Sequence, residues 1–429
     1  MNVFFHTFGC RANQYDTELV RQAFADRGAA VVDDPAAADV AVVNSCTVTQ
    51  ESEAKLRRFV RRLARRVGGA GRRLETVVMG CAAARDDGSL RALPSVRGVV
   101  GGADPAAVLS AAGLAASRVD PVLRRFGANA RGWLKIQDGC DEHCSFCATT
   151  LARGSNRSRS IPELVQEARA LAQHHAEIVL TGVHIGTYGK EREAGREKRE
   201  GSSLGKGRKA GRGKREGSSL GELLGALITA VPEVRFRLSS IEATEVDDRI
   251  ARVLIEEPRR LAPYLHAPLQ SGSNRVLRRM GRHWYTAESY RARLEWLAAR
   301  LPVFGLGADV IAGFPGETDA DHQATLALIR ALPFTSLHVF PYSARPDTAA
   351  TRLRDAVPPG VVRVRAAELR TLGEEKSLAY RGCRAGATAD GVASGRMAGR
   401  VDVLTEDYLS VYIPVEQWDG RARFPVKVA

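Results

Sequence analysis

The sequence lacks long apolar runs. No stretch of its 429 residues approaches the roughly 20 consecutive apolar residues that a membrane-spanning helix requires. The first residues, MNVFFHTFGC, also lack the basic region and the long apolar segment of a secretory signal. These absences argue against membrane insertion and export. We therefore expect a cytoplasmic protein without a membrane partner.

Acidic residues are in short supply: 49 Asp and Glu stand against 63 Lys and Arg, for a formal charge of +14. Such an excess is typical of proteins that bind polyanions. Residues 190–219 hold eleven basic and five acidic side chains, so this segment contributes +6 and leaves +8 elsewhere. It is rich in glycine, and the sequence Lys-Arg-Glu-Gly-Ser-Ser-Leu-Gly occurs twice, starting at Lys198 and at Lys214. Because it has too few apolar residues to offset the entropy of ordering, we expect a disordered insertion.

Carboxylates are almost absent from the most basic helical pattern, within residues 51–67, where seven Lys and Arg fall between positions 55 and 66. Apolar residues recur there at the spacing of a helix with one buried stripe. Ion pairs between successive helical turns do not explain these basic residues, because almost no acidic residues are interleaved with them. We predict contact with RNA phosphates, with a merely solvated face as the alternative. The predicted contacts are Arg57, Arg58, Arg61, Arg62 and Arg65.

The sequence lacks a second C-x2-C knuckle. Structural zinc sites commonly use two such knuckles, whereas only Cys144 and Cys147 have this spacing here. Instead, Cys140, Cys144 and Cys147 form a C-x3-C-x-x-C loop with Phe146 before the last cysteine. Three thiolates at this spacing can bind three irons of a [4Fe-4S] cluster and leave the fourth iron without a protein ligand. A zinc-containing RNA-binding protein is the alternative, and it would need a fourth ligand.

Three further cysteines, Cys10, Cys46 and Cys81, each follow a short apolar run. Helical patterns at 16–27 and 51–67 come after the first two. Alternating strands and helices predict a parallel sheet, whose strand ends gather at one edge. The three thiols can therefore converge and bind a second cluster. The alternative is three unrelated buried thiols.

The loop at Cys140 resembles the signature of the radical S-adenosylmethionine superfamily, and other segments are similar to the methylthiotransferases within it. These segments are HTFGCRAN (6–13), NSCTV (44–48), MGC (79–81), ARG (152–154), RSR (157–159), LTGVHIG (180–186), RLSSIE (237–242), HAPLQSGS (266–273), DVIAGFPGET (309–318) and HVFPYS (338–343). The first segment and Ser-Ser-Ile-Glu are most similar to the branch that modifies N6-threonylcarbamoyladenosine, at position 37 of tRNA beside the anticodon.

The resemblance implies an S-adenosylmethionine-dependent transferase with two [4Fe-4S] clusters. The cysteines of the 140–147 loop would bind the cluster that cleaves S-adenosylmethionine, and the other three would bind the cluster that delivers sulfur to C2 of the adenine. An electron donor such as a flavodoxin or ferredoxin is implied as well. No catalytic residue is assigned. The implied cofactor contacts are Thr181, Gly182, Ser240, Gln270 and Asp309.

The implied substrate is the tRNA anticodon loop, whose bases are single-stranded and can leave the stack. Arg153, Arg157 and Arg159 shortly follow the cluster loop. Arginine binds phosphate and carboxylate through two parallel hydrogen bonds, so we predict contacts with RNA or with the cofactor carboxylate. A surface role is the alternative.

Four histidines lie near the ends of predicted strands: His6, His184, His266 and His338. Their positions would suit a metal site. Since six cysteines already account for both clusters, we predict that these histidines serve in packing and hydrogen bonding.

The patterns divide the chain into three parts and predict an α/β multidomain fold. Residues 1–120 form a parallel α/β domain, and residues 125–365 alternate strands with helices as in a partial or complete parallel barrel. Residues 385–429 contain strand-like runs at 400–404 and 409–413 and resemble the small RNA-binding β domain named TRAM. Chemistry is expected at the C-terminal ends of the barrel strands.

Other functions remain open. The same chemistry acts on isopentenyladenosine of tRNA or on an aspartate of a ribosomal protein in sister branches of the family. A nonenzymatic iron-sulfur redox sensor that binds RNA is an alternative of another class, and it predicts clusters without cleavage of S-adenosylmethionine.

Overall fold

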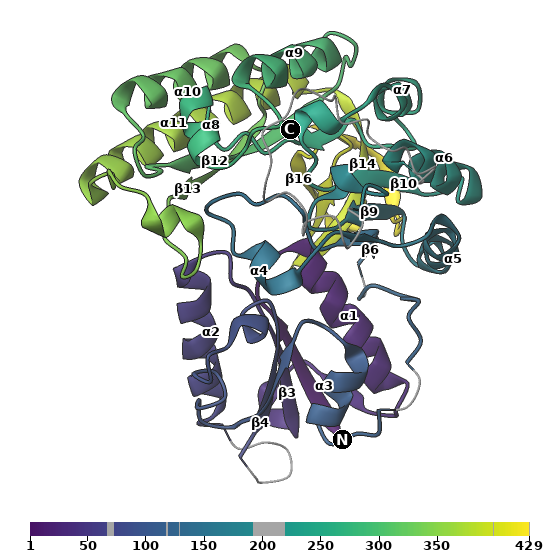
Figure 1. Ribbon diagram of the computed structural model, residues 1–429. Coiled ribbons are helices and arrows are strands. Elements are labelled where there is room, and N and C mark those ends of the chain that lie inside the picture. Colours follow the sequence, from purple (N-terminus) through teal and green to yellow (C-terminus); the bar gives the residue numbers. More distant parts are fainter. Residues whose placement is uncertain (67–72, 117–118, 128, 192–218, 398, 429) are drawn as a thin grey trace, which may run out of the picture.

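The computed structural model describes residues 1–66, 73–116, 119–127, 129–191, 219–397 and 399–428. Figure 1 shows an N-terminal α/β domain below a larger α/β domain, with a C-terminal β domain behind the larger one. The expected α/β multidomain fold is confirmed. Most of the predicted insertion at 190–219 lies outside the described residues.

The N-terminal domain is built on a parallel sheet with the strand order β2-β1-β3-β4-β5. Its strands are β1 (Asn2–Thr7), β2 (Ala30–Val32), β3 (Val40–Ser45), β4 (Glu75–Gly80) and β5 (Val96–Gly101). Helices α1 (Arg11–Ala25) and α3 (Pro105–Ala111) cover one face, and α2 (Gln50–Leu63) covers the other. Burial of both faces explains the near-continuous apolar runs in the central strands.

Helix α1 begins at Arg11, five residues before the predicted start at residue 16. The additional turn buries the polar Asn13 together with Ala12 and Tyr15, so it lacks the large aliphatic residues that mark a helix in sequence. Cys10 is the N-cap of this helix and has extended backbone angles. A predicted ligand therefore stands at the junction of β1 and α1.

The larger domain is a partial barrel of parallel strands. The strands are β6 (Arg131–Lys135), β9 (Glu177–Thr181), β10 (Arg235–Leu238), β11 (Tyr264–His266), β12 (Gly305–Ala312) and β13 (Ser336–Pro341). They form two three-stranded sheets, β6-β9-β10 and β11-β12-β13, which parallel bridges join between β10 and β11. Among the described strands, β6 does not pair with β13, so the barrel is open on one side.

Helices cover the outside of this curved sheet (Figure 1). They are α5 (Ile161–Ala172), α6 (Leu220–Ala230), α7 (Asp248–Glu256), α8 (Asn274–Arg279), α9 (Ala287–Ala298) and α10 (Asp319–Ala331). A short hairpin of β7 (Gln137–Asp138) and β8 (Arg157–Ser158) flanks α4 (Thr149–Arg153) at the mouth of the barrel. The cysteine loop 140–147 lies between β7 and α4, so it opens toward the N-terminal domain.

The barrel holds a buried charge network that the sequence patterns did not predict. Glu177, Arg235 and Arg237 have no exposed side-chain surface. Glu177 pairs with Arg235 at 2.7 Å, with Arg237 at 2.9 Å and with Arg131 at 2.7 Å. Such a buried cluster is stable only when every member is paired, because an isolated buried charge carries a large desolvation penalty.

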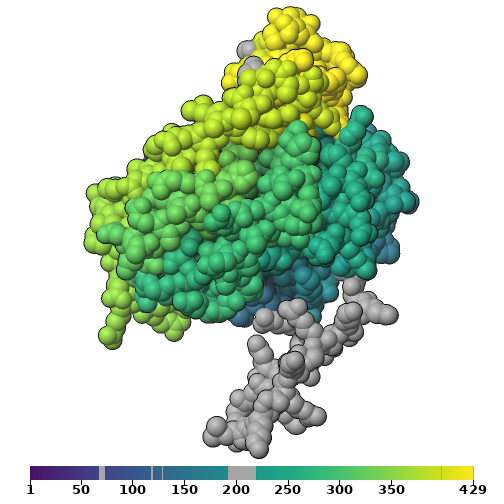
Figure 2. Space-filling view, turned by 90° about the horizontal axis from the view of Figure 1, so that it is seen from above, coloured from purple at the N-terminus to yellow at the C-terminus, as the bar shows by residue number. Residues whose placement is uncertain are grey.

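Helix α11 (Pro359–Arg384) leads to an antiparallel sheet with the order β16-β15-β14-β17. Its strands are β14 (Thr388–Met397), β15 (Arg400–Leu404), β16 (Ser410–Pro414) and β17 (Arg423–Lys427), which confirms the two predicted strand runs. Arg237 donates to the carbonyl oxygens of Thr405 and Glu406, which anchors the sheet to the barrel. Figure 2 shows this domain projecting from one end of the molecule. Within the described residues, no helix has both the length and the apolar character of a membrane span.

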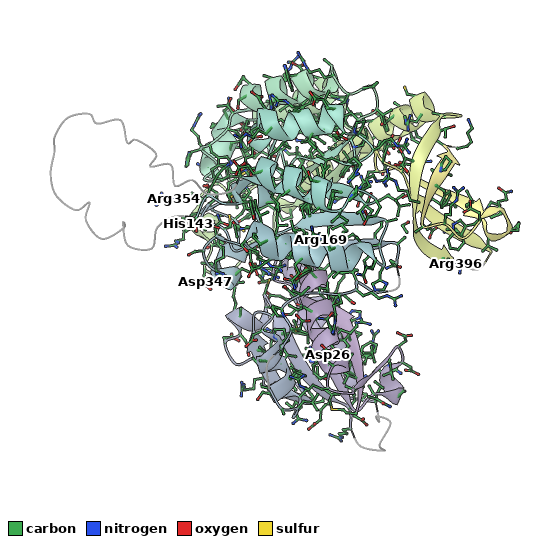
Figure 3. All side chains as sticks on the ribbon, turned by 90° about the vertical axis from the view of Figure 1, so that its right-hand side faces the viewer. Asp26, His143, Arg169, Asp347, Arg354 and Arg396 are labelled. Carbon is green, nitrogen blue, oxygen red and sulfur yellow. The ribbon has the colours of Figure 1, made fainter. Side chains whose placement is uncertain are left out.

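Polar contacts hold the N-terminal domain against the barrel. Trp133 donates to Gln14 at 2.7 Å, and Arg345 donates to Thr47 at 3.1 Å. Asp347, labelled in Figure 3 at the boundary of the two domains, pairs with Arg85 at 2.8 Å. These contacts direct the C-terminal ends of β1, β3 and β4 toward the mouth of the barrel.

Candidate functional site

The first cysteine group belongs to the barrel. Cys140, Cys144 and Cys147 are partly exposed and form no disulfide. Backbone N–H groups donate to two of the sulfurs, from Glu142 to Cys140 and from Thr149 to Cys147, each at 3.4 Å. Both sulfurs thus accept a hydrogen bond from the main chain of their own loop.

The third sulfur, on Cys144, accepts from the Arg282 guanidinium at 3.4 Å. Burial raises the pKa of this thiol to about 12, and Arg282 acts in the opposite direction. A metal ion bound to the Cys144 sulfur would keep it as thiolate in spite of the burial. Arg282 itself pairs with Glu242 and lies over the Trp284 ring, so its position is well constrained.

The second cysteine group gathers around the side chain of Asn13. Its amide oxygen lies 3.4 Å from the Cys10 sulfur and 3.9 Å from the Cys81 sulfur. Its amide nitrogen donates to the Ser45 carbonyl at 2.8 Å, next to Cys46. The parallel register aligns the ends of β1, β3 and β4, which explains how thiols far apart in sequence meet.

Close packing beside Cys46 requires a glycine. A Cβ atom added to Gly9 would lie 3.2 Å from the Cys46 sulfur, and Gly9 has a φ of 114° that favours glycine. Burial raises the pKa of Cys46, and it raises that of Cys81 to about 11. Neither thiol forms a disulfide. The site therefore contains three free, converging thiols.

Arg153 joins the two cysteine groups. It ends α4, and its Nε donates to the Cys81 sulfur at 3.2 Å. Its terminal nitrogens bond to Asp16 at 2.8 Å and Asp138 at 2.9 Å, and only 8% of its side chain is exposed. All three guanidinium nitrogens are thus engaged inside the protein. The predicted contact of Arg153 with RNA or with the cofactor carboxylate stays a prediction.

The other two arginines near the cluster loop differ from each other. Arg159 pairs with buried Glu167 at 2.8 Å and donates to Tyr15, and 24% of its side chain is exposed. Its contact with RNA or with the cofactor carboxylate stays a prediction. Arg157 is exposed and bonds to backbone carbonyls of Ser155 and Arg153. Its contact with RNA stays a prediction.

A cavity of about 820 Å³ lies between the N-terminal domain and the barrel. It is lined on one side by Cys10 and Cys46. On the other side it is lined by four of the five predicted cofactor contacts: Thr181, Gly182, Ser240 and Asp309. This size lies within the range of small-molecule and cofactor sites.

The fifth predicted contact, Gln270, lines an adjoining cavity of about 190 Å³ together with Asp309, Phe146 and Ile311. Gln270 has a φ of 63°, a strained conformation for a residue other than glycine. Phe146 belongs to the cysteine loop, so this apolar recess touches the first cysteine group. The two cavities share Asp309, and between them they are lined by Cys10 and Cys46 of the second group and by Phe146 of the first cysteine loop.

Histidines surround the large cavity. His266 lies 2.9 Å and His338 lies 3.3 Å from the same oxygen of Asp309. Burial alone would raise the pKa of Asp309, but these two histidines hold it well below its usual range. His184 lies between Glu245, at 2.9 Å, and the Cys140 sulfur, at 3.6 Å. All three histidines have hydrogen-bond partners. His266 and His338 with Asp309, and His184 with Glu242 and Glu245, also have the spacing of metal ligands, so the hydrogen-bonding role stays a prediction.

The basic residues of α2 form a separate surface. Arg58, Arg61, Arg62 and Arg65 are exposed, whereas Arg57 donates to Ser89 at 2.8 Å. A cleft of about 420 Å³ on this surface is lined by Lys55, Arg58 and Arg62 together with the aromatic side chains of His6, Phe8 and Phe59. Cationic and aromatic groups side by side suit a nucleotide, since one binds phosphate and the other stacks on a base.

Several residues of the site were not singled out by sequence reasoning. Arg11 and Tyr408 both line the large cavity, and Arg282 contacts the first cysteine group. Tyr408 belongs to the C-terminal domain, where no motif marks it. Arg11 lies inside the quoted HTFGCRAN segment, so its place beside Cys10 was the available signal.

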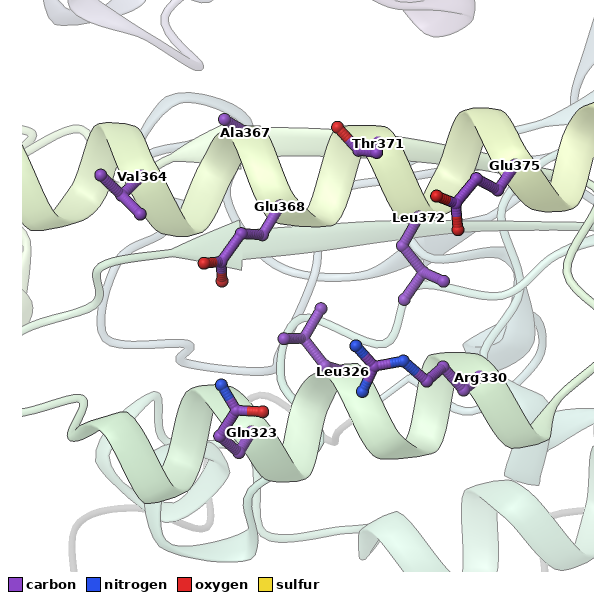
Figure 4. Close-up of a pocket in the computed structure, with 9 residues that line it drawn as sticks. All are labelled: Gln323, Leu326, Arg330, Val364, Ala367, Glu368, Thr371, Leu372 and Glu375. Atoms are coloured by element: carbon purple, nitrogen blue, oxygen red, sulfur yellow. The ribbon is translucent and has the colours of Figure 1, made fainter.

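Another cavity, of about 590 Å³, lies between α10 and α11 and is shown in Figure 4. It is lined by Leu326, Leu372, Glu368, Arg330 and neighbouring side chains, none of them a cysteine. No predicted site residue lines it. The candidate active site is therefore the large cavity beside Cys10 and Cys46.

Two family models match the chain, one over each cysteine group. Residues 2–101 match the model described as Uncharacterized protein family UPF0004. Residues 134–329 match the model of the Radical SAM superfamily. The second match contains the loop with Cys140, Cys144 and Cys147, and the first contains Cys10, Cys46 and Cys81.

Several proteins with related names match this chain over most of their length. The chain is 35% identical over 396 residues to threonylcarbamoyladenosine tRNA methylthiotransferase MtaB of Bacillus subtilis, covering 88% of this chain and 81% of that protein. It is 34% identical over 392 residues to the protein of that name from Thermotoga maritima, covering 87% and 82%. It is 33% identical over 395 residues to tRNA-2-methylthio-N(6)-dimethylallyladenosine synthase of Acidithiobacillus ferrooxidans, covering 86% and 80%.

A solved structure shares the fold. The radical S-adenosylmethionine methyltransferase TsrM of Kitasatospora setae, with cobalamin and a [4Fe-4S] cluster bound, superimposes with a TM-score of 0.58. The match covers 81% of this chain and 76% of that chain at 15% identity. At this identity the likeness concerns the arrangement of the domains alone.

Proposed function

The chain belongs to the radical S-adenosylmethionine methylthiotransferase family, and we propose that it inserts a methylthio group at C2 of N6-threonylcarbamoyladenosine beside the anticodon of tRNA. The enzyme uses S-adenosylmethionine and at least one [4Fe-4S] cluster. One observation carries the proposal: a single cavity is lined both by Cys10 and Cys46 and by the predicted cofactor contacts Thr181 and Asp309. A base placed there would lie beside Cys10 and Cys46 and next to the recess that Phe146 of the first cysteine loop lines.

The residues at the first cysteine group fit a [4Fe-4S] cluster. Three thiols are free, two accept backbone N–H groups, and the third accepts from Arg282. When bound by Cys140, Cys144 and Cys147, the cluster would supply the electron that cleaves S-adenosylmethionine to methionine and a 5′-deoxyadenosyl radical, which removes the hydrogen from C2. The apolar recess beside Phe146 and Gln270 suits the adenosyl part of the cofactor.

A second [4Fe-4S] cluster on Cys10, Cys46 and Cys81 is part of the proposal. Asn13 and Arg153 contact these sulfurs, so a neutral amide and a cation surround the group. A cationic donor beside a sulfur stabilises an anionic cluster. In this assignment the three cysteines position the sulfur that C2 receives, and a second S-adenosylmethionine supplies the methyl group.

Two partners complete the proposal. The exposed arginines of α2 and Arg157 bind the phosphates of the anticodon stem and loop, and the C-terminal domain binds RNA as TRAM domains do. A flavodoxin or ferredoxin supplies electrons in the cytoplasm. Arg58, Arg61 and Arg65 support the RNA assignment, because none of them pairs with a carboxylate among the described residues.

The test is mass spectrometry of nucleosides from bulk tRNA of cells with the intact gene, without it, and with a Cys144→Ala version. We expect 2-methylthio-N6-threonylcarbamoyladenosine to disappear in the last two and its precursor without the methylthio group to accumulate. Unchanged nucleosides would refute the proposal and favour a ribosomal-protein substrate or a redox sensor.

Isopentenyladenosine is the second candidate substrate, since relatives at 33% identity are named for that reaction. The same measurement separates the two. Loss of the 2-methylthio derivative of isopentenyladenosine, with the threonylcarbamoyl nucleoside unchanged, would select the alternative.

A further inference from the structure

Arg11 is a cation in the large cavity without a carboxylate partner among the described residues. It lines the cavity directly after Cys10. Its Nη2 donates to the Tyr408 hydroxyl at 2.7 Å, which leaves further guanidinium donors uncommitted. A partly buried guanidinium in this state attracts an anion.

The carboxylates of the cavity are already engaged. Glu51 pairs with Lys55 at 2.9 Å, on the rim. Asp309 lies between His266 and His338. Neither carboxylate forms an ion pair with Arg11 in the described structure. An anionic ligand in the cavity would supply the charge partner that Arg11 lacks among the described residues.

His338 is the second polar group that faces this ligand. Its side chain is 61% exposed and lines the cavity. Its Nδ1 lies toward Asp309, and its Nε2 has no hydrogen-bond partner among the described residues. The bond to Asp309 raises the pKa of His338, and the charge of Arg11 acts in the opposite direction. Arg11 and His338 thus line the same cavity, and within the described part of the chain both present side-chain nitrogens without a partner to it.

Tyr408 holds Arg11 in place. Its ring stacks on Tyr264 with the centroids 4.4 Å apart, and the Arg237 guanidinium lies 5.2 Å from its ring centre. The backbone of Tyr408 has a φ of 74°, which is uncommon for a bulky residue and points to a constrained position. The C-terminal domain thereby inserts one side chain into the cavity and orients the cation.

We propose that Arg11 and His338 bind the carboxylate of the threonylcarbamoyl group and thereby select a substrate with an anionic N6 substituent over one with an apolar substituent. This inference rests on the proposed function. The chemistry of adenine supports the location. C2 and C6 are both bonded to N1 of the ring, and C6 carries N6, so a base that presents C2 to the cysteines brings its N6 substituent into the same cavity. Arg11 directly follows Cys10, as this geometry requires.

Selection against an apolar group follows from the same contacts. An isopentenyl substituent would remove water from the Arg11 guanidinium and offer no hydrogen-bond acceptor in return. Sites built to hydrogen-bond a polar substrate group reject analogues that lack it, because the buried polar partner is left unpaired. Arg11 therefore favours binding of the threonylcarbamoyl substrate and disfavours binding of the isopentenyl substrate.

The test compares two anticodon stem–loop oligonucleotides, one with N6-threonylcarbamoyladenosine and one with its methyl ester, which keeps the shape and removes the charge. We expect the holoenzyme to prefer the acid over the ester by about tenfold or more in kcat/KM, as for a charge-assisted hydrogen bond. The Arg11→Gln variant should reduce this preference to about twofold or less. Arg11→Lys should retain part of it.

The ratio of the two substrates separates recognition from damage to the neighbouring cysteine group, since a general loss of activity cancels. Arg169→Gln, at an exposed arginine of α5 labelled in Figure 3, is the control that should keep the wild-type ratio. Formation of 5′-deoxyadenosine and iron content are measured alongside. If Arg11→Gln is inactive on both substrates, two other measurements test the inference. One is the ratio of the dissociation constants of this variant for the acid and the ester oligonucleotide, and the other is the kcat/KM ratio of His338→Gln for the same two substrates.

Equal rates of the wild type on acid and ester would overturn the inference, as would an Arg11→Gln variant that keeps the full preference. A wild type that modifies neither oligonucleotide, yet modifies one with isopentenyladenosine, would refute the proposed substrate itself. The two failures are thus distinct.

Discussion

Arg153 donates a hydrogen bond from its Nε to the Cys81 sulfur at 3.2 Å, and this contact crosses the boundary between the barrel and the N-terminal domain. The same guanidinium bonds to Asp16 on one side of the boundary and to Asp138 on the other. Arg153 follows Cys147 by six residues. One side chain thus connects the loop of the first cysteine group with a sulfur of the second.

Replacing Arg153 should shift the reduction potential of the second cluster. A positive charge beside a cluster favours its reduced form, so Arg153→Gln should lower the potential by on the order of 60 mV, about 1.4 kcal/mol for one electron. A redox titration followed by electron paramagnetic resonance measures this. Arg157→Gln, at an exposed neighbour, is the control. An unchanged potential in Arg153→Gln would show that its role is limited to holding the domains together.

The two cysteine groups should be separable by substitution. The triple change Cys10→Ala, Cys46→Ala and Cys81→Ala should reduce the iron content from about eight atoms per chain to about four. This variant should still cleave S-adenosylmethionine to 5′-deoxyadenosine but should transfer no methylthio group.

The converse variant, Cys144→Ala, should lose the cleavage because it lacks a ligand of the first cluster. Cys383→Ala, at an exposed cysteine outside both groups, should match the wild type in iron content and activity. An iron content near four in the wild-type chain, after full reconstitution, would contradict the second cluster.

The basic surface of α2 should govern the affinity for tRNA. Removal of three exposed charges by Arg58→Gln, Arg61→Gln and Arg65→Gln should weaken tRNA binding about tenfold or more. The dependence of log Kd on log salt concentration should become shallower by about two, as expected for three lost phosphate contacts. Fluorescence anisotropy with labelled tRNA at several salt concentrations gives both quantities.

The matched control removes three exposed arginines elsewhere: Arg169→Gln on α5, Arg291→Gln on α9 and Arg300→Gln just after the end of α9. It alters the net charge equally and should change the salt dependence far less. Equal effects of the two triple variants would mean that tRNA responds to the total charge of the protein and to no particular surface.

Glu177 should be essential for stability. Its carboxylate neutralises a buried cluster of Arg131, Arg235 and Arg237, so Glu177→Gln should lower the free energy of unfolding by about 3–5 kcal/mol. Chemical denaturation measures the loss. Glu295→Gln breaks the exposed pair with Arg291 and should cost about 0.5 kcal/mol or less. Similar losses in both variants would contradict the importance of the buried network.

The same carboxylate makes stability depend on pH in a defined direction. Complete burial alone would raise the pKa of Glu177, but Arg237, Arg235 and Arg131 hold it well below its usual range. A depressed pKa in the folded state adds stability above the ordinary pKa of about 4.3, and this contribution is lost as the pH falls toward the folded value. The unfolding free energy should therefore decrease below about pH 4.5 in the wild type, and Glu177→Gln should show a smaller decrease.

The sequence by itself determined the chemistry of the cysteines and the order of the domains. The spacing of Cys140, Cys144 and Cys147 is local, so the loop can be recognised without a fold. Apolar runs and helical periodicity located the strands before Cys10, Cys46 and Cys81, because burial on both faces of a parallel sheet leaves a direct pattern in sequence.

Only the tertiary structure decided which charges are buried and which face a ligand. Arg153 and Arg58 look alike in sequence, yet one is enclosed by Asp16 and Asp138 and the other is exposed. The contact between Arg11 and Tyr408 spans 397 positions and depends on how three domains pack. Long-range ion pairs and stacked rings follow no sequence period, because their partners come from different elements, and so the cavity between the cysteine groups appears only in the folded chain.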